Sequence, residues 1–156
     1  MVQTANASRV LLRPVVKLVA GVVGLLLLEY IILALPMVKE LPSPGLSISI
    51  LQIVSAIIAT AIIILLINFG IEISQACRVF FPTFQGSGTI AHMVVVLVTI
   101  LVAYKSYQDL AQVFLGKHLW AYLLAFLVLI LLPLIYLVYL CYINLDKLAD
   151  VTLGGF

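Results

Sequence analysis

The chain has 156 residues, of which 65% are hydrophobic and 9% are charged, and its mean hydropathy is +1.34. This balance lies far outside that of soluble domains and excludes a soluble monomer. Eight Lys and Arg against six Asp and Glu give a formal charge of +2, an excess too small to predict a nucleic-acid partner. The composition predicts a single integral membrane domain whose first partner is the lipid bilayer.

The first predicted membrane span covers residues 15–38. Roughly 20 apolar residues cross a bilayer core, and Glu29 is the one charged residue between Leu18 and Val38. The run Lys39-Glu40-Leu41-Pro42-Ser43-Pro44-Gly45 then predicts a tight connection, because proline ends helices.

The second predicted span covers residues 47–75, within a stretch from Leu41 to Ile71 that contains no Asp, Glu, Lys or Arg. Its serines at 47 and 49 suit a helix that starts at the lipid headgroups. Aromatic residues and then a glycine-containing segment follow, and these predict a second connection with Thr89 as the N-cap of the next helix.

The third and fourth predicted spans cover residues 90–114 and 119–142. The apolar run Ile90–Tyr104 has only 15 residues, fewer than the roughly 17 needed to span, so the third helix is expected to continue through Lys105. The fourth segment carries Trp and Tyr towards both ends, the pattern of a span with aromatic belts.

These segments predict an all-α fold, an integral membrane bundle of four transmembrane helices. Four helices of this size enclose little beyond their own side chains, so the bundle is expected to be oligomeric. Basic residues at alternate ends set the orientation. One side carries Arg9, Arg13, Lys17, Arg78 and Lys147, and the other carries Lys39, Lys105 and Lys117. Five against three predicts that both termini lie in the cytoplasm.

Glu29 is the sharpest single feature, because a carboxylate inside a span is costly and is expected to face a partner or water. One hypothesis makes Glu29 a cation ligand or proton carrier. The alternative is an intramembrane pair of Glu29 with Lys105. The two residues lie at comparable depths, so their side chains can meet if the two helices touch.

A second candidate is a narrow face of small and polar residues on the second span. Gln52, Ser55, Ala59 and Thr60 recur at three- and four-residue steps. Such a face either packs against another helix or lines a pore.

Further candidates lie at the predicted cytoplasmic end. Asn68 and Glu72 share a different face of the second span, where symmetry-related copies would form a polar ring that attracts cations. His92 enters the third span at a similar level, where a histidine can respond to pH. Together with Glu29, these residues are the candidates for an ion pathway, and each is also compatible with a purely structural role.

Catalytic and metal-binding motifs are missing from the sequence. It contains no H-E-x-x-H, Walker A or G-x-S-x-G pattern, and its two cysteines lack metal-ligand spacing. We therefore expect a protein that is not an enzyme and that uses no metal or cofactor.

Three functions fit these observations. The first is a homo-oligomeric channel-like protein that passes a small ion. The second is a non-catalytic subunit or assembly factor of a larger membrane complex, in which the partners are other membrane subunits rather than copies of this chain. The third is a proton-coupled carrier that uses Glu29 and His92.

Overall fold

The computed structural model describes residues 2–35, 49–81, 84 and 86–144. Every element in this part of the chain is helical, which confirms the all-α class. The elements, in chain order, are α1 (Val2–Ala34), α3 (Ile50–Phe80), α4 (Ser87–Leu115), the short 3₁₀ helix η1 (Gly116–His118) and α5 (Leu119–Ile143). The predicted end of the first span, at residue 38, and the predicted start of the second, at residue 47, lie outside the described residues.

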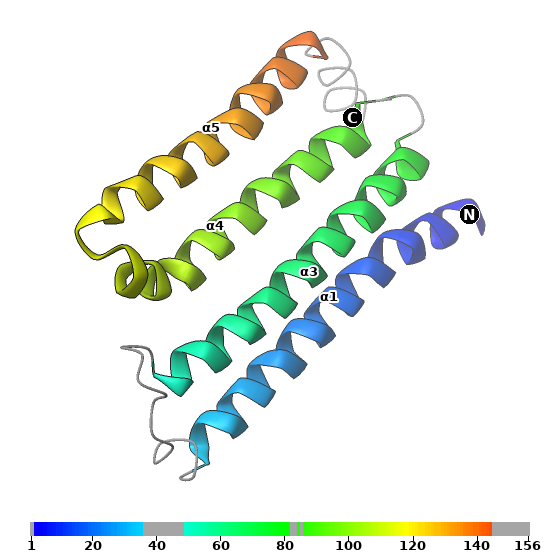
Figure 1. The fold of residues 1–156 in the computed structure, drawn as a ribbon. Coiled ribbons are helices and arrows are strands. Elements are labelled where there is room, and N and C mark those ends of the chain that lie inside the picture. Colours follow the sequence, from blue (N-terminus) through cyan, green and yellow to red (C-terminus); the bar gives the residue numbers. More distant parts are fainter. Residues whose placement is uncertain (1, 36–48, 82–83, 85, 145–156) are drawn as a thin grey trace.

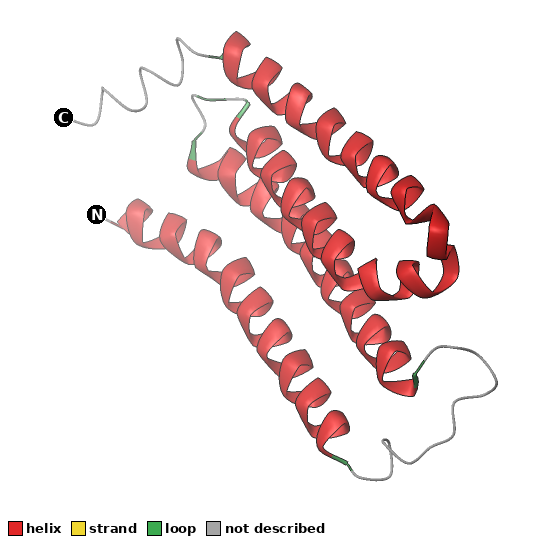
Figure 2. Ribbon diagram, turned by 90° about the vertical axis from the view of Figure 1, so that its left-hand side faces the viewer, coloured by secondary structure: helices red, strands yellow, loops and turns green. Residues whose placement is uncertain are grey.

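The long helices stand side by side in the order α1, α3, α4, α5 (Figure 1). Each packs on its neighbours in the chain, and in the described part of the chain the backbone of α1 does not approach that of α4 or α5, nor the backbone of α3 that of α5. In the view from the side, the two middle helices overlap and one helix lies on either side of them (Figure 2). The expected bundle is therefore an open layer. Its helices are apolar around most of their circumference, so lipid satisfies them as well as a closed core would.

The layer has a thin core. Five hydrophobic residues are buried in the described part, namely Ile58, Ala59, Leu66, Ala76 and Phe84. α5 buries none of its residues, although it is the most apolar of the helices. The fold thus leaves large apolar faces for lipid or for other proteins.

Three helical stretches are long and apolar enough to cross a membrane: Val10–Ala34, Ile50–Phe80 and Ser87–Ile143. The third comprises α4, η1 and α5. It reverses direction at Gly116, whose φ of 45° is the left-handed conformation that glycine tolerates best. α4 and α5 then run antiparallel (Figure 1). A small helical membrane protein is therefore supported.

The ends of the helices differ from those predicted, for local reasons. α1 begins at Val2 and continues through Pro14. It ends at Ala34, before the predicted end, because Leu35 precedes Pro36 and a residue before proline disfavours the helical conformation. α4 begins at Ser87 with Gly86 as its N-cap, so the prediction of Thr89 as the N-cap was wrong. As predicted, α4 continues well past Lys105, to Leu115.

The start of α3 is fixed by a capping box. The Ser49 hydroxyl accepts a hydrogen bond from the backbone N–H of Gln52 at 3.2 Å, and the Gln52 side chain accepts one from the backbone N–H of Ser49 at 3.0 Å. This reciprocal pair satisfies donors that would otherwise remain open at the helix terminus. It also fixes Gln52 beside the first turn of α3.

Glycines allow the closest approaches between helices. A Cβ on Gly88 would lie 2.5 Å from the carbonyl oxygen of Ser74, and one on Gly21 would lie 2.8 Å from a methyl group of Leu65. α4 therefore approaches the backbone of α3, and α1 approaches a side chain of α3. Gly24 has nothing within 4 Å, so it is not a packing point.

Candidate functional site

Glu29 and Ser55 join α1 to α3. The Ser55 hydroxyl donates a hydrogen bond to the Glu29 carboxylate at 2.7 Å, in a partly buried setting. Glu29 lies five residues before the end of α1 at Ala34, and Ser55 lies five residues after the start of α3 at Ile50. At about 1.5 Å per residue, both are about 7.5 Å from these helix ends. The sequence predicts Glu29 near the middle of the first span. In the structure it is instead near the end of α1.

A groove opens beside this contact, on the face of α3 between α1 and α4. Its volume is about 240 Å³, and its lining residues are Leu33, Leu51, Gln52, Ser55, Ser106, Asp109 and Leu110. We call it the Ser55 groove. Three helices contribute to it, and its polar atoms come from two hydroxyls, an amide and the exposed carboxylate of Asp109.

The structure does not bring Glu29 and Lys105 together. α3 lies between the helices that carry them, and the backbones of α1 and α4 do not approach each other within the described ranges. Lys105 is exposed, one helical turn before Asp109, and does not line the Ser55 groove. The carboxylate of Glu29 has the hydroxyl of Ser55 as its partner instead.

The predicted face of small and polar residues on α3 divides between three environments. Gln52 and Ser55 line the Ser55 groove, and Ala59 is buried. Thr60 lies against α4, where its hydroxyl is 2.6 Å from that of Tyr107 and also donates to the carbonyl oxygen of Ala56 at 2.7 Å. The four residues thus do not share one surface.

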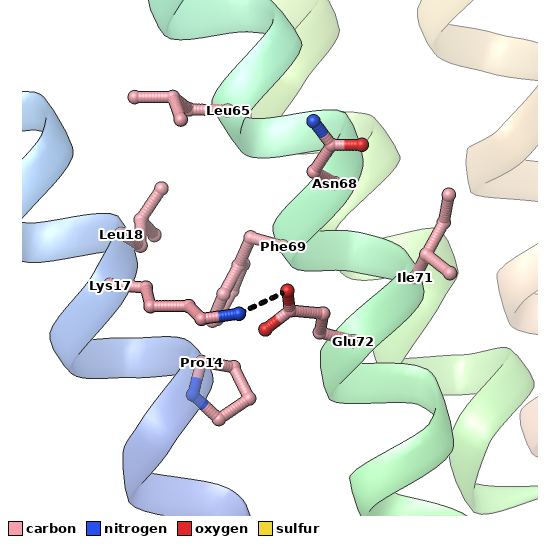
Figure 3. A pocket seen from close by; sticks show the side chains of 8 residues that line it. All are labelled: Pro14, Lys17, Leu18, Leu65, Asn68, Phe69, Ile71 and Glu72. Carbon is pink, nitrogen blue, oxygen red and sulfur yellow. Dashed lines mark hydrogen bonds and ion pairs between the residues drawn. The ribbon is translucent and has the colours of Figure 1, made fainter.

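An ion pair that sequence reasoning missed joins α1 to α3 twelve residues before Glu29, near the middle of α1. The Lys17 ammonium lies 2.8 Å from the Glu72 carboxylate, and the two side chains are 57% and 40% exposed (Figure 3). Asn68 lies beside this pair in the same groove. The sequence contained a signal for this pair. Two successive spans run antiparallel, so a lysine in the first and a glutamate in the second can lie at the same depth and pair.

His92 lies on a different seam, between α3 and α4. It lines an almost wholly apolar cavity of about 310 Å³ with Gly70, Val95 and Thr99. A Cβ on Gly70 would lie 3.2 Å from the His92 ring, so this glycine makes room for the imidazole. Of the candidates for an ion pathway, the structure therefore brings Asn68 and Glu72 together and separates them from both Glu29 and His92.

An aromatic cluster attaches α5 to the layer. Tyr104 of α4 contacts Tyr122 and Phe126 of α5, with ring centroids 5.6 and 5.4 Å away. The Tyr122 hydroxyl donates to the carbonyl oxygen of Tyr104 at 2.5 Å. Sequence reasoning placed Tyr122 in an interfacial belt and did not identify this contact.

The middle of the layer is apolar. Leu18–Leu28 of α1 contains no polar side chain, Ala56–Ile67 of α3 contains only Thr60, and Met93–Ala103 of α4 contains only Thr99. Thr60 bonds to α4 and to its own helix, and the Thr99 hydroxyl donates to the carbonyl oxygen of Val95 at 2.8 Å. Along α1, an apolar stretch therefore separates the Lys17–Glu72 pair from the Glu29–Ser55 contact.

The described polar side chains of the two sites offer hydrogen-bond donors, acceptors and charge. In the described part of the chain, no group of three or more His, Cys, Asp or Glu side chains is placed to hold a metal ion. Comparison with protein-family models, with curated proteins and with solved structures finds no match.

Proposed function

We propose that this chain is a non-catalytic subunit of a larger membrane complex, and that it holds a transmembrane helix of a partner protein in the Ser55 groove. The main observation that supports this proposal is the open row of helices. Each long helix touches only its neighbours in sequence, so the faces of the layer remain available to other helices. In lipid, such faces associate through close packing and interhelical hydrogen bonds.

The placement of polar groups favours a subunit over a pore. A passage for ions needs polar or charged groups, or water, along its length. Here the apolar stretch Leu18–Leu28 of α1 separates the Ser55 groove from the Lys17–Glu72 pair. Between them, the two hydroxyls of Thr60 and Thr99 are used within the protein. The apolar middle is suited to contact with another helix.

The proposal includes four membrane crossings with both termini in the cytoplasm. α4 has 29 residues and α5 has 25, and each exceeds the roughly 20 residues that one crossing needs. The reversal at Gly116 then lies on the non-cytoplasmic side, together with the Ser55 groove. The excess of basic residues near the N-terminus supports this orientation.

The partner is a transmembrane helix with Lys or Arg within about two turns of its non-cytoplasmic end. Asp109 supplies an exposed carboxylate in the groove and makes no ion pair among the described residues. Ser55 and Ser106 add hydroxyls, and the Ser55 hydroxyl is itself bonded to the Glu29 carboxylate. A basic side chain satisfies these acceptors through charge-assisted hydrogen bonds.

Synthetic helices of about 20 Leu and Ala residues provide a direct test. One carries a single Lys near its non-cytoplasmic end, and its matched control carries Leu there. Energy transfer between protein and helix in phosphatidylcholine vesicles measures their association. We expect the Lys helix to bind about tenfold more tightly, consistent with an interhelical hydrogen bond of about 1–2 kcal/mol.

Two variants make this test specific. Asp109→Asn should remove the preference for the Lys helix, and Glu72→Gln, which alters a carboxylate at the other end, should leave it unchanged. Equal binding of the two helices by the wild type would contradict the proposal. Loss of the preference in Glu72→Gln would also contradict it, because the effect would then not depend on the Ser55 groove.

Ion flux separates the subunit from the other two functions. The purified protein in liposomes should pass no potassium, sodium, calcium or protons above the background of empty liposomes. Flux that Glu29→Gln or Glu72→Gln alters would overturn the proposal in favour of an ion-passing oligomer. Proton-dependent transport that Glu29→Gln abolishes would instead identify a carrier.

A further inference from the structure

A second surface, between α1 and α3 at the end that bears the N-terminus, also has the features of a binding site. Two grooves meet at the Lys17–Glu72 pair. The one we call the Phe69 groove has a volume of about 310 Å³ (Figure 3), and its lining residues are Pro14, Lys17, Leu18, Leu65, Asn68, Phe69, Ile71 and Glu72. The one we call the Arg13 groove has a volume of about 460 Å³, and its lining residues are Val10, Arg13, Pro14, Lys17, Glu72, Gln75, Ala76 and Val79.

We propose that these two grooves together bind one anionic phospholipid, with its phosphate in the Arg13 groove and an acyl chain along the Phe69 groove. This inference depends on insertion into a membrane and is independent of the partner helix proposed above.

Charge complementarity selects the headgroup. Arg13 and Lys17 line the Arg13 groove against one carboxylate, that of Glu72, so the lining has a net charge of +1. Gln75 adds an amide donor. The guanidinium group forms paired hydrogen bonds to phosphate oxygens, and the ammonium adds a point charge. The headgroup must therefore carry net negative charge, which a zwitterionic choline headgroup does not.

Glu72 fixes the position of the lysine. Its carboxylate holds the Lys17 ammonium at 2.8 Å, where the two grooves meet. This contact partly neutralises Lys17 and leaves Arg13, one helical turn away, as the principal phosphate ligand.

The order of polar and apolar side chains along the two grooves matches the order of headgroup and acyl chain in a phospholipid. Arg13 and Gln75 lie on the side of the ion pair nearer the N-terminus of α1 and the C-terminus of α3, whereas Leu65 and Phe69 lie on the side nearer the middle of both helices. Leu18 begins the apolar stretch of α1 directly after Lys17. The polar part of the surface is thus at headgroup depth and the apolar part faces the hydrocarbon.

Native mass spectrometry of the detergent-purified protein tests the site with two lipids of equal chain length, phosphatidylglycerol and phosphatidylcholine. We expect one phosphatidylglycerol molecule to be retained with at least about fivefold preference, the factor expected for one basic residue near a membrane surface. Arg13→Gln should reduce this preference about fivefold and leave the Lys17–Glu72 pair intact. Lys117→Gln, which removes a charge at the opposite end, is the matched control and should not change it.

Glu72→Gln should change the affinity for phosphatidylglycerol in the opposite direction. A variant that merely misfolds would not bind the lipid more tightly. Removal of the carboxylate raises the net charge of the groove and releases Lys17, so phosphatidylglycerol should bind more tightly. Weaker binding in Glu72→Gln, equal losses in Arg13→Gln and Lys117→Gln, or equal retention of both lipids would overturn the proposal. Displacement of the lipid by millimolar inorganic phosphate would overturn it too, because the site would then recognise a free anion rather than a lipid.

Discussion

Ser55 donates a hydrogen bond to Glu29 across the seam between α3 and α1, and Glu29 lies twelve residues along α1 from Lys17, which pairs with Glu72. At about 100° per residue, Glu29 and Lys17 are about 120° apart around α1. Side chains from two sides of α1 thus reach α3, with Gly21 packed against Leu65 between the two contacts. This pairing fixes α1 against α3 and leaves the rest of α1 to its surroundings.

Ser55→Ala should destabilise the protein. The substitution leaves the partly buried Glu29 carboxylate without its hydroxyl donor, which costs about 1–3 kcal/mol. Unfolding in mixed micelles by titration with dodecyl sulfate measures the loss. Glu29→Gln should cost less than Ser55→Ala, because its amide oxygen still accepts the hydrogen bond.

A pair of double-mutant cycles isolates this contact. Glu29→Leu with Ser55→Ala should show a coupling free energy of about 1 kcal/mol, whereas Glu29→Leu with Lys105→Met should be additive within about 0.5 kcal/mol. Strong coupling of Glu29 to Lys105 would show that the two side chains meet after all, contrary to the order of the helices.

Neutralisation of the exposed ion pair should have a small effect that depends on salt. Lys17→Met and Glu72→Met should each change the free energy of unfolding by about 0–1 kcal/mol, because both side chains are accessible to solvent. The effect should shrink between 50 mM and 1 M NaCl as screening increases. A large loss that is insensitive to salt would mean that the pair is desolvated in the membrane.

Gly88→Ala should destabilise the seam between α3 and α4. Its Cβ would lie 2.5 Å from the backbone oxygen of Ser74, which cannot move without displacing α3. Such overpacking costs about 1–3 kcal/mol. Gly24→Ala is the matched control, because its Cβ meets nothing within 4 Å and alanine favours the helix by about 0.8–1 kcal/mol. The same micellar unfolding experiment should show opposite signs for the two variants.

The sequence was sufficient to predict the helices but not their neighbours. Stretches with no charged residue, or with Glu29 alone in the first, identified the apolar helices, and the shortness of Ile90–Tyr104 correctly required α4 to include Lys105. Pairing between helices could not be predicted in the same way. Lipid replaces a hydrophobic core, so hydropathy does not say which face of a helix meets another. The proposed contact of Glu29 with Lys105 depended on depth alone, and it failed to account for α3 between them.

The candidate site could be predicted only in part for the same reason. Ser55 and Gln52 were recognised as polar residues at helical spacing, and both line the Ser55 groove. Asp109 and Ser106 complete that groove from α4, and nothing in their spacing indicates that they face α3. Ala59 and Thr60 shared the sequence pattern but lie elsewhere, because the face of α3 that meets α4 crosses the polar stripe.

Labelling of single cysteines should show that α4 and α5 each cross the membrane. In a background of Cys77→Ser and Cys141→Ser, Lys117→Cys places a thiol in η1, which is exposed at the reversal of the chain. Arg13→Cys places one near the other end of the layer. With four crossings, an impermeant maleimide should label Lys117→Cys in intact cells, whereas Arg13→Cys should react only after the membrane is permeabilised. Reaction of both thiols from the same side would show that residues 13 and 117 lie on the same side of the bilayer, contrary to the prediction. It would also remove the Ser55 groove from the non-cytoplasmic side, because that groove and η1 lie at the same end of α4.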